Sequence, residues 1–252
     1  MKKFFLLLII GVSCTQLWSQ NVEKTSKQIN SNEDRNFRIP LIGETTPSFT
    51  AVSTNGTINF PEDYGSNWKI LFSHPKDFTP VCSTEILELA HLQGQFEKLG
   101  VKLVVISTDR LETHVQWKKA LEMVKLDNRE TEKIKFPLVD DENIAVSKQY
   151  GMIHPETNST RSVRGVFIID PNNIIQAIYF YPMNVGRNTD ELIRMVKALQ
   201  VSAKEKVMTP ANWNEGKDVL VKTPPKNVAN NETPEIEGYS NPAWFLWFKK
   251  AN

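Results

Sequence analysis

The sequence contains few cysteines, only Cys14 and Cys82 among 252 residues. Two thiols are too few for a small scaffold held together by disulfides or for a zinc site built from cysteines. An excess of one charge is also missing, because 30 Lys and Arg residues stand against 29 Asp and Glu residues, a formal net charge of +1. Nucleic-acid binding is therefore not indicated, since it needs a clustered excess of basic side chains.

Internal repeats and a glycine-rich phosphate loop are also missing from the sequence. Hydrophobic residues make up 40% and charged residues 23% of the chain. This mixture is typical of a folded protein and too apolar for a disordered one. The length predicts one full domain with room for a smaller second one.

The N-terminus has the pattern of an export signal. Lys2 and Lys3 precede an apolar run over residues 4–12. That run is too short to cross a bilayer, which takes ~20 residues. We expect residues 1–20 to be a cleaved signal peptide that directs export, to a bacterial periplasm or envelope. A second interpretation stays open, in which the chain is a lipoprotein anchored through Cys14.

Removal of residues 1–20 would leave Cys82 as a single thiol with no partner for an internal disulfide. Such a thiol is a buried bystander, half of an intermolecular disulfide or a reactive nucleophile. Residues 21–38 are polar and lack periodicity, so we expect a flexible tether there.

Apolar runs and helix signals then predict alternating strands and helices, with Val115, Leu121 and Val124 on the apolar face of the second helix. The expected strands cover 68–73, 101–107, 165–170 and 174–180, and the expected helices cover 80–99, 111–126 and 188–199. Parallel β-α units followed by a hairpin and a helix predict an α/β fold with a central mixed sheet. This is the thioredoxin-like arrangement, which we place over residues 39–201.

The character of the chain changes after Val201, where prolines and aromatic residues gather. We expect a C-terminal extension over residues 202–252. Its aromatic side chains need something to cover them. A partner subunit and the chain's own sheet remain equal alternatives.

The most informative stretch surrounds Cys82. Thr79 at the N-cap and Pro80 at the first helical position are a strong helix start, which places Cys82 in the first turn. Free backbone N–H groups and the positive end of the helix dipole favour a thiolate there, and a thiolate is an effective nucleophile. A buried inert cysteine is the alternative, but the neighbours Ser83 and Thr84 are polar.

Pro75, Thr79 and Cys82 form the pattern P-x-x-x-T-x-x-C, which resembles the peroxiredoxins. The stretch from residue 71 to 82 is similar to the one-cysteine, peroxiredoxin-6-type branch of that family. Further motifs of the branch follow in order at 181–182, 186–188, 191, 194 and 212–219. The resemblance covers the chain from about residue 39 onward.

The resemblance implies a thiol peroxidase that reduces hydrogen peroxide and organic hydroperoxides in antioxidant defence. Cys82 would attack the O–O bond and become a sulfenic acid. Thr79 would hydrogen-bond the bound peroxide, and Pro75 would shield the thiolate. Arg164 would lie beside the sulfur and stabilise negative charge on it.

Three further residues are implied as supporting the site. Arg187 resembles a second arginine of the family, with Glu85 as its orienting partner. His74 either tunes the site or is a hydrogen-bonded structural histidine. Without the resemblance, Arg164 and Arg187 would be taken for members of surface salt bridges.

The departures from the family also carry information. No second cysteine follows the predicted signal peptide, so an external reductant, a thioredoxin-like protein or a small thiol, would have to reduce the sulfenic acid. Some one-cysteine members carry G-x-S-x-G, but residues 65–69 have Asn67 in place of the serine, and phospholipase activity is not supported. We expect no cofactor and no metal, and a homodimer or larger assembly through the extension.

Other activities remain as alternatives. A disulfide oxidoreductase on the same fold normally needs C-x-x-C, whereas here a single cysteine stands alone. A peroxide sensor or redox-switched chaperone would use Cys82 with little turnover. A Cys–His hydrolase has the weakest support, because no particular histidine pairs with Cys82 in the sequence.

Overall fold

The computed structural model describes residues 38–221 and 234–251. The predicted signal peptide over residues 1–20 and the predicted tether up to residue 37 lie outside this part of the chain. Over the described residues, no helix has both the length and the apolar character that crossing a bilayer demands.

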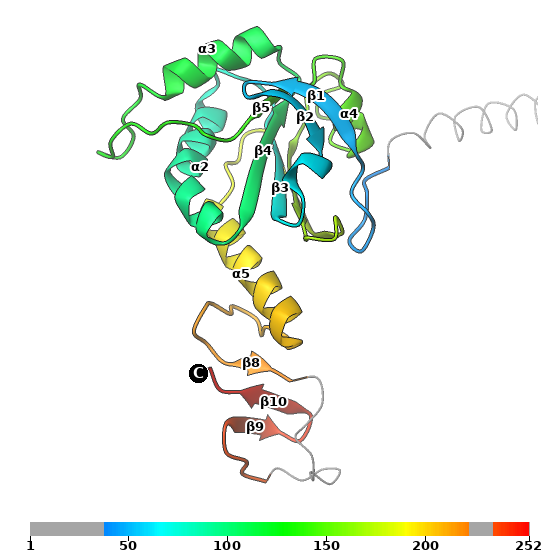
Figure 1. Cartoon of the computed structure of the whole chain (residues 1–252), viewed down its shortest axis with the longest axis vertical. Coiled ribbons are helices and arrows are strands. Elements are labelled where there is room, and N and C mark those ends of the chain that lie inside the picture. The colour runs from blue at the N-terminus through cyan, green and yellow to red at the C-terminus, as the bar shows by residue number, and fades with distance from the viewer. Residues whose placement is uncertain (1–37, 222–233, 252) are drawn as a thin grey trace, which may run out of the picture.

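Seven strands form one mixed sheet in the order β2-β1-β5-β4-β3-β6-β7. The strands are β1 (Phe49–Ser53), β2 (Gly56–Phe60), β3 (Trp68–Ser73), β4 (Val101–Ser107), β5 (Leu138–Asp140), β6 (Arg164–Ile169) and β7 (Ile175–Tyr181). The helices are η2 (Glu62–Tyr64), α2 (Pro80–Lys98), α3 (Leu111–Leu121), α4 (Ala145–Gln149) and α5 (Thr189–Glu205). The predicted central mixed sheet covered by helices is therefore confirmed (Figure 1).

Strand β3 lies in the middle of the sheet, parallel to β4 and antiparallel to β6. Its side chains alternate between two hydrophobic clusters, since successive strand residues point to opposite faces. Phe72 packs with residues of α2 and α5, whereas Leu71 packs on the other face with residues that include Val146 of α4. Both faces of β3 are thus buried, and the strand holds the start of α2 in a fixed place.

Several predicted elements are confirmed. The strands expected at 68–73 and 101–107 coincide with β3 and β4, and β6 and β7 form the expected hairpin. Asn188 caps α5, because its side-chain oxygen accepts a hydrogen bond of 3.1 Å from the backbone N–H of Glu191. The prediction missed the β1–β2 hairpin, β5 and α4.

The second predicted helix, over 111–126, was too long. Helix α3 ends at Leu121, where the N–H of Val124 bonds to the carbonyl three residues back at 2.9 Å and tightens the last turn. Glu122 then accepts a hydrogen bond from the N–H of Ile134, which draws the chain away from the helix axis. Val124 is 40% exposed and does not belong to the apolar face. The buried side of α3 consists of His114, Trp117 and Leu121.

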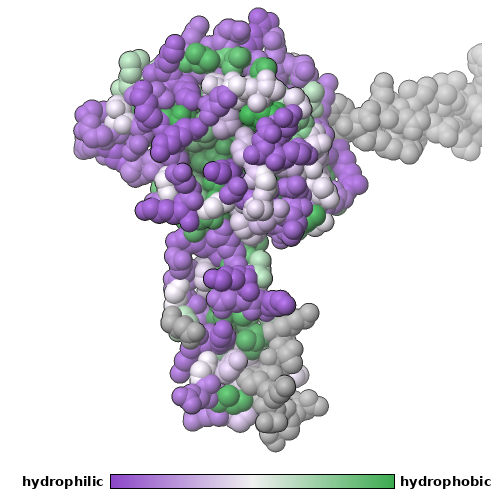
Figure 2. Space-filling model, in the orientation of Figure 1, coloured by the Kyte–Doolittle hydropathy of each residue, from purple (hydrophilic) through white to green (hydrophobic). Residues whose placement is uncertain are grey.

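Helix α5 spans the predicted boundary between residues 201 and 202 and leads to a small three-stranded sheet at its far end (Figure 1). The strands of this sheet are β8 (Val219–Leu220), β9 (Tyr239–Ala243) and β10 (Leu246–Lys249). Trp213 and Trp247 are buried within the chain itself, and Trp213 packs against Ala198 of α5. Trp244 and Phe245 remain exposed, and hydrophobic residues interrupt the polar surface of the extension (Figure 2).

Candidate active site

Cys82 lies in the first turn of α2, as predicted, and is only 1% exposed. Thr79 has the extended backbone of an N-cap, and its carbonyl accepts the first helical hydrogen bond from Ser83 at 2.9 Å. The Thr79 hydroxyl does not cap the helix, however, because it donates to the carbonyl of Lys76 at 2.8 Å. The hydroxyl oxygen therefore keeps its lone pairs for another donor.

Arg164 is the first residue of β6 and reaches the sulfur from the strand next to β3. Its Nη1 atom lies 3.3 Å from Sγ of Cys82. Nε and Nη2 both donate to the carbonyl of Met183, at 3.0 and 2.5 Å. The guanidinium plane is thus fixed from the side opposite the thiol, so its charge stays aimed at the sulfur.

Glu85 lies one helical turn after Cys82 and joins the two arginines. Its Oε2 atom accepts from Nη1 of Arg164 at 2.6 Å and from Nη2 of Arg187 at 2.7 Å, and its Oε1 atom accepts from Nε of Arg187 at 2.8 Å. Burial alone raises the pKa of Glu85, but the hydrogen bonds and charge of Arg187 and the charge of Arg164 hold that pKa below its usual range. Glu85 is therefore ionised.

Arg187 is held on every side. Its Nη1 atom donates to the carbonyls of Ser73 at 2.8 Å and Gly165 at 3.0 Å, and its guanidinium carbon lies 3.3 Å from the centre of the Phe72 ring. Burial lowers the pKa of Arg187, whereas Glu85 raises it. Because an arginine starts from so high a pKa, this side chain stays charged.

The charges of this cluster do not balance by themselves. Two guanidinium groups and one carboxylate leave one positive charge in a region where the side chains are about 2% exposed or less. An uncompensated buried charge is costly. The sulfur of Cys82 lies against this surplus charge, 3.3 Å from Arg164, so negative charge that develops at the sulfur or on an atom bound beside it is stabilised.

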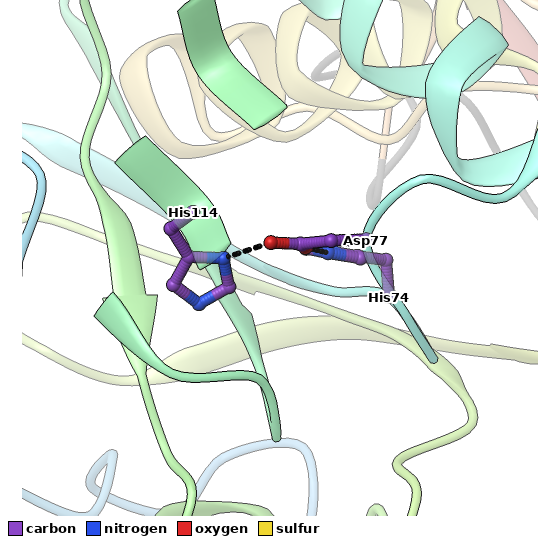
Figure 3. A group of neighbouring side chains, drawn as sticks. All are labelled: His74, Asp77 and His114. Atoms are coloured by element: carbon purple, nitrogen blue, oxygen red, sulfur yellow. Dashed lines mark hydrogen bonds and ion pairs between the residues drawn. The ribbon is translucent and has the colours of Figure 1, made fainter. Parts of the chain in front are cut away.

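His74 belongs to a second buried cluster, with Asp77 and His114 (Figure 3). Nε2 of His74 lies 2.8 Å from Oδ1 of Asp77, and Nδ1 of His114 lies 2.7 Å from Oδ2. Two ligands of a tetrahedral zinc, each bound at ~2.0–2.1 Å, would lie about 3.3 Å apart. The shorter contacts are those of hydrogen bonds, so the three side chains are closed on one another rather than arranged around an ion.

The structure brings most of the predicted site residues together. Arg164, Arg187 and Glu85 form the cluster at Cys82, and Pro75 is buried in the turn before α2. His74 makes its side-chain hydrogen bond with Asp77 and packs its ring 5.0 Å from that of Trp117, the arrangement expected of a structural histidine.

Sequence reasoning missed two buried residues near the site, Asp77 and His114. Their contact joins positions 37 residues apart. Asp77 is part of the stretch that carried the family resemblance, but no local pattern links it to His114, so the sequence held no signal for this pair.

Comparison with known proteins agrees with this geometry. Residues 42–178 match the AhpC/TSA family, and residues 198–233 match the C-terminal domain of 1-Cys peroxiredoxin. A peroxiredoxin of Methanosarcina mazei is 45% identical over 215 residues, which cover 84% of this chain and 98% of that protein. A peroxiredoxin of Aquifex aeolicus is 38% identical over 224 residues, covering 84% of this chain and 98% of the relative.

Two solved structures share the fold. A yeast mitochondrial 1-Cys peroxiredoxin gives a TM-score of 0.72 at 36% identity and covers 84% of this chain and 100% of its own. A cysteine-to-serine mutant of peroxiredoxin 6 of Arenicola marina gives 0.69 at 32% identity, with 84% and 98% covered. The predicted thioredoxin-like fold is confirmed, and the chain belongs to the AhpC/TSA family as a peroxiredoxin of the one-cysteine type, a thiol-dependent peroxidase.

Proposed function

We propose that Cys82 is the sulfur that reacts with the peroxide. The thiolate attacks one oxygen of the O–O bond, the bond breaks, and the other oxygen leaves with the bonding electrons and takes up a proton. The sulfur is oxidised to sulfenic acid, and the peroxide is reduced to water or an alcohol. The observation that carries this proposal is the 3.3 Å contact between Arg164 and Sγ of Cys82 in a cluster with one surplus positive charge.

The neighbours take distinct roles in this scheme. Arg164 stabilises negative charge on sulfur before the attack and on oxygen as the bond breaks. Glu85 and Arg187 keep Arg164 in place. The Thr79 hydroxyl donates its own proton to the carbonyl of Lys76, so its oxygen accepts a hydrogen bond from the peroxide. Pro75 shields the thiolate from water.

The sulfenic acid needs a reductant from outside the chain. Cys82 is the only cysteine of the described residues, and it is free. We propose that a small thiol or a thioredoxin-like protein forms a mixed disulfide with Cys82 and releases water, and that a second thiol then restores the reduced enzyme. The yeast relative has a thiol resolving mechanism via glutathione and thioredoxin systems.

A pair of single substitutions tests the assignment. Cys82→Ser should abolish thiol-dependent peroxide reduction, because Cys82 lies beside Arg164, whereas Cys14→Ser should leave it unchanged, because Cys14 falls in the predicted signal peptide. Steady-state peroxide consumption is measured with glutathione, or with thioredoxin and its reductase, and circular dichroism checks the fold. Near-normal turnover in the Cys82→Ser protein would refute the proposal. Oxidation of Cys82 without turnover under both reductants would instead favour a sensor.

We further propose that the chain forms a homodimer through its extension. Trp244 and Phe245 are 49% and 70% exposed, and exposed aromatic pairs of this kind fit an interface with a second copy. Replacing both with alanine should lower the sedimentation coefficient at micromolar concentration. Met123→Ala, at another exposed apolar position on the main domain, should not. An unchanged mass in the double variant would count against the interface.

We also propose that residues 1–20 direct export, with a lipoprotein anchored at Cys14 as the alternative. The support is the pair Lys2 and Lys3 before the apolar run over 4–12. N-terminal sequencing of the native protein from fractionated cells decides the matter. An intact start at Met1 in the cytosol would end the export proposal, and a membrane-bound form that begins at Cys14 would establish the lipoprotein.

A further inference from the structure

The second buried cluster lies in the turn that connects β3 to α2. Asp77 is 1% exposed, and its two oxygens face the imidazoles of His74 and His114 at 2.8 and 2.7 Å (Figure 3). His74 directly follows the last residue of β3, whereas His114 comes from the first turn of α3. The carboxylate therefore ties the turn to a helix that is distant in sequence.

The protons of this cluster follow from its partners. A carboxylate only accepts, so Nε2 of His74 and Nδ1 of His114 each donate to Asp77. Nε2 of His114 lies 3.1 Å from the carbonyl oxygen of Val139 and must donate as well. The three contacts involve five side-chain atoms and three N–H protons, so the two imidazoles and the carboxylate together have no net charge.

The surrounding groups support this state. Burial lowers the pKa of His74, which keeps that ring neutral, and its Nδ1 atom has no hydrogen-bond partner in the described part of the chain. Burial raises the pKa of Asp77, but hydrogen bonds from His114 and His74 hold it below its usual range. Asp109, which accepts from the Asp77 N–H, forms its own ion pair with Arg161 at 2.7 Å.

The turn itself is strained. Phe78 follows Asp77 and adopts φ of +53°, in the left-handed region that aromatic residues avoid. Its side chain is 55% exposed, and its ring lies 6.4 Å from the ring of the buried Trp117. Strained residues persist only where their surroundings fix them, and they gather at functional sites. Besides that ring contact, the Asp77 side chain and the Asp77 N–H, which donates to Asp109 at 2.8 Å, hold the backbone next to Phe78.

We propose that Asp77 is a positioning residue, which is clamped between His74 and His114 and holds the turn of residues 74–79 so that Pro75 and Thr79 stay beside Cys82. Thr79 is the N-cap and Cys82 the third residue of α2, so any movement of the turn displaces the hydroxyl relative to the sulfur. The charge cluster around Arg164 does not depend on this contact. Loss of the Asp77 contacts should therefore impair the reaction with peroxide much more than the nucleophilicity of the thiolate.

Two substitutions of His114 isolate the contact. In His114→Asn the amide nitrogen takes the place of Nδ1 and still donates to Asp77. In His114→Gln the longer side chain reaches toward Val139 instead. Both variants lose the ring, so they share the packing defect. We expect the rate constant for Cys82 oxidation by hydrogen peroxide to stay within a few-fold of wild type in His114→Asn and to fall about 100-fold in His114→Gln, the scale of a displaced catalytic group.

Alkylation of Cys82 by iodoacetamide is the second readout. It requires the thiolate but no peroxide-binding turn, so both variants should react within a few-fold of wild type. Equal loss of alkylation and oxidation in His114→Gln would overturn the proposal, because the cluster would then act on the thiolate or on the whole fold. Equal oxidation rates in the two variants would overturn it as well.

Asp77→Ala has a matched control on another loop. Asp141 is also a buried carboxylate, 2% exposed, and it accepts from the N–H groups of Val146 and Ser147 at 2.9 and 2.8 Å. Asp77→Ala should lose most of its peroxide reactivity, whereas Asp141→Ala should keep it when both are folded. Comparable losses in the two variants would contradict a specific role for Asp77.

If the Asp77 variants do not fold, the protonation of the His74 ring can be measured in the wild-type protein instead. Ring-nitrogen NMR should show a proton on Nε2 and none on Nδ1 of His74. A proton on Nδ1 of His74, or one equivalent of zinc bound through these side chains in the purified protein, would overturn the hydrogen-bonded cluster.

The inference rests on Cys82 as the reacting sulfur. Residual turnover in Cys82→Ser would refute that assignment separately, whatever the His114 variants show.

Discussion

Two buried polar clusters flank the start of α2, and they differ in how their charges balance. The cluster of Arg164, Glu85 and Arg187 has a surplus positive charge and touches Cys82. The cluster around Asp77 is neutral and is closed by its own two histidines. Both are shielded from water to a similar degree.

The difference separates chemistry from positioning. An incomplete set of charges in a buried site stabilises whatever group completes it, which here is the thiolate before the reaction and the departing oxygen during it. The cluster around Asp77 has no charge left to neutralise. It therefore stabilises only the arrangement of its own side chains and of the backbone turn that carries Asp77. The first cluster should therefore govern how reactive the sulfur is, and the second should govern where the peroxide sits.

The largest effect is expected from breaking the charged cluster at its centre. Glu85→Ala leaves two buried guanidinium groups without their carboxylate and should lower the free energy of unfolding by about 3–5 kcal/mol. Glu88→Ala is the control on the same helix, because the Glu88–Arg129 pair is 30% exposed on both sides. Its cost should stay below about 1 kcal/mol. Urea denaturation measures both, and equal costs would show that Glu85 is not the centre of a buried ion cluster.

Removal of the contact with the thiol should have the next largest effect. Arg164→Ala should slow oxidation of Cys82 by about 100-fold, the usual cost of removing one donor from a site of developing charge. It should also slow the alkylation of Cys82 by iodoacetamide at neutral pH, because the sulfur loses the cation beside it. Arg164→Lys keeps the charge but loses the planar contacts with Met183, so an intermediate rate is expected. An alkylation rate in Arg164→Ala equal to that of wild type would contradict the claim that the Arg164 charge activates the sulfur.

Acid should weaken both clusters by a smaller amount. The folded-state pKa values of Glu85 and Asp77 lie below their reference values of 4.5 and 3.8. Each carboxylate thus stabilises the fold above its unfolded pKa, and this contribution is lost as the pH falls through the folded pKa, at about 1.4 kcal/mol per unit of difference. Denaturation midpoints between roughly pH 3 and 6 should fall with acid in wild type and less steeply in Glu85→Gln and in Asp77→Asn. If the denaturation midpoint changes equally with pH in all three proteins, neither carboxylate contributes to the acid sensitivity of the fold.

The parts of the fold that local signals control were predictable. Thr79 and Pro80 start α2, and Asn188 caps α5, because both signals act within a few residues of the chain. The end of α3 was not predictable, since it is set by a hydrogen bond from Ile134 to Glu122 across an irregular segment. The β1–β2 hairpin was missed although Asn55 and Gly56 carry a common hairpin signal.

The candidate site divides in the same way. The resemblance to a family supplied Cys82, Arg164, Arg187 and Glu85, and the structure brings these four together. The role of Asp77 required the structure, because its contact with His114 depends on how α3 is placed after β4. For the aromatic residues of the extension, the sequence left two alternatives, cover by a partner subunit or by the chain itself. Trp213 and Trp247 are covered by the chain itself, whereas Trp244 remains exposed.

The most direct test of the central claim is the intact mass of the protein, with peptide mapping, after one equivalent of hydrogen peroxide. Cys82 should take up a single oxygen atom, which an added thiol removes, and this uptake should be absent in Cys82→Ser. Further peroxide without a thiol should add a second oxygen, as the sulfenic acid is oxidised to sulfinic acid. Uptake confined to methionine residues, or no uptake at Cys82 while peroxide is consumed, would contradict the claim that the surplus charge around Cys82 makes it the reacting sulfur.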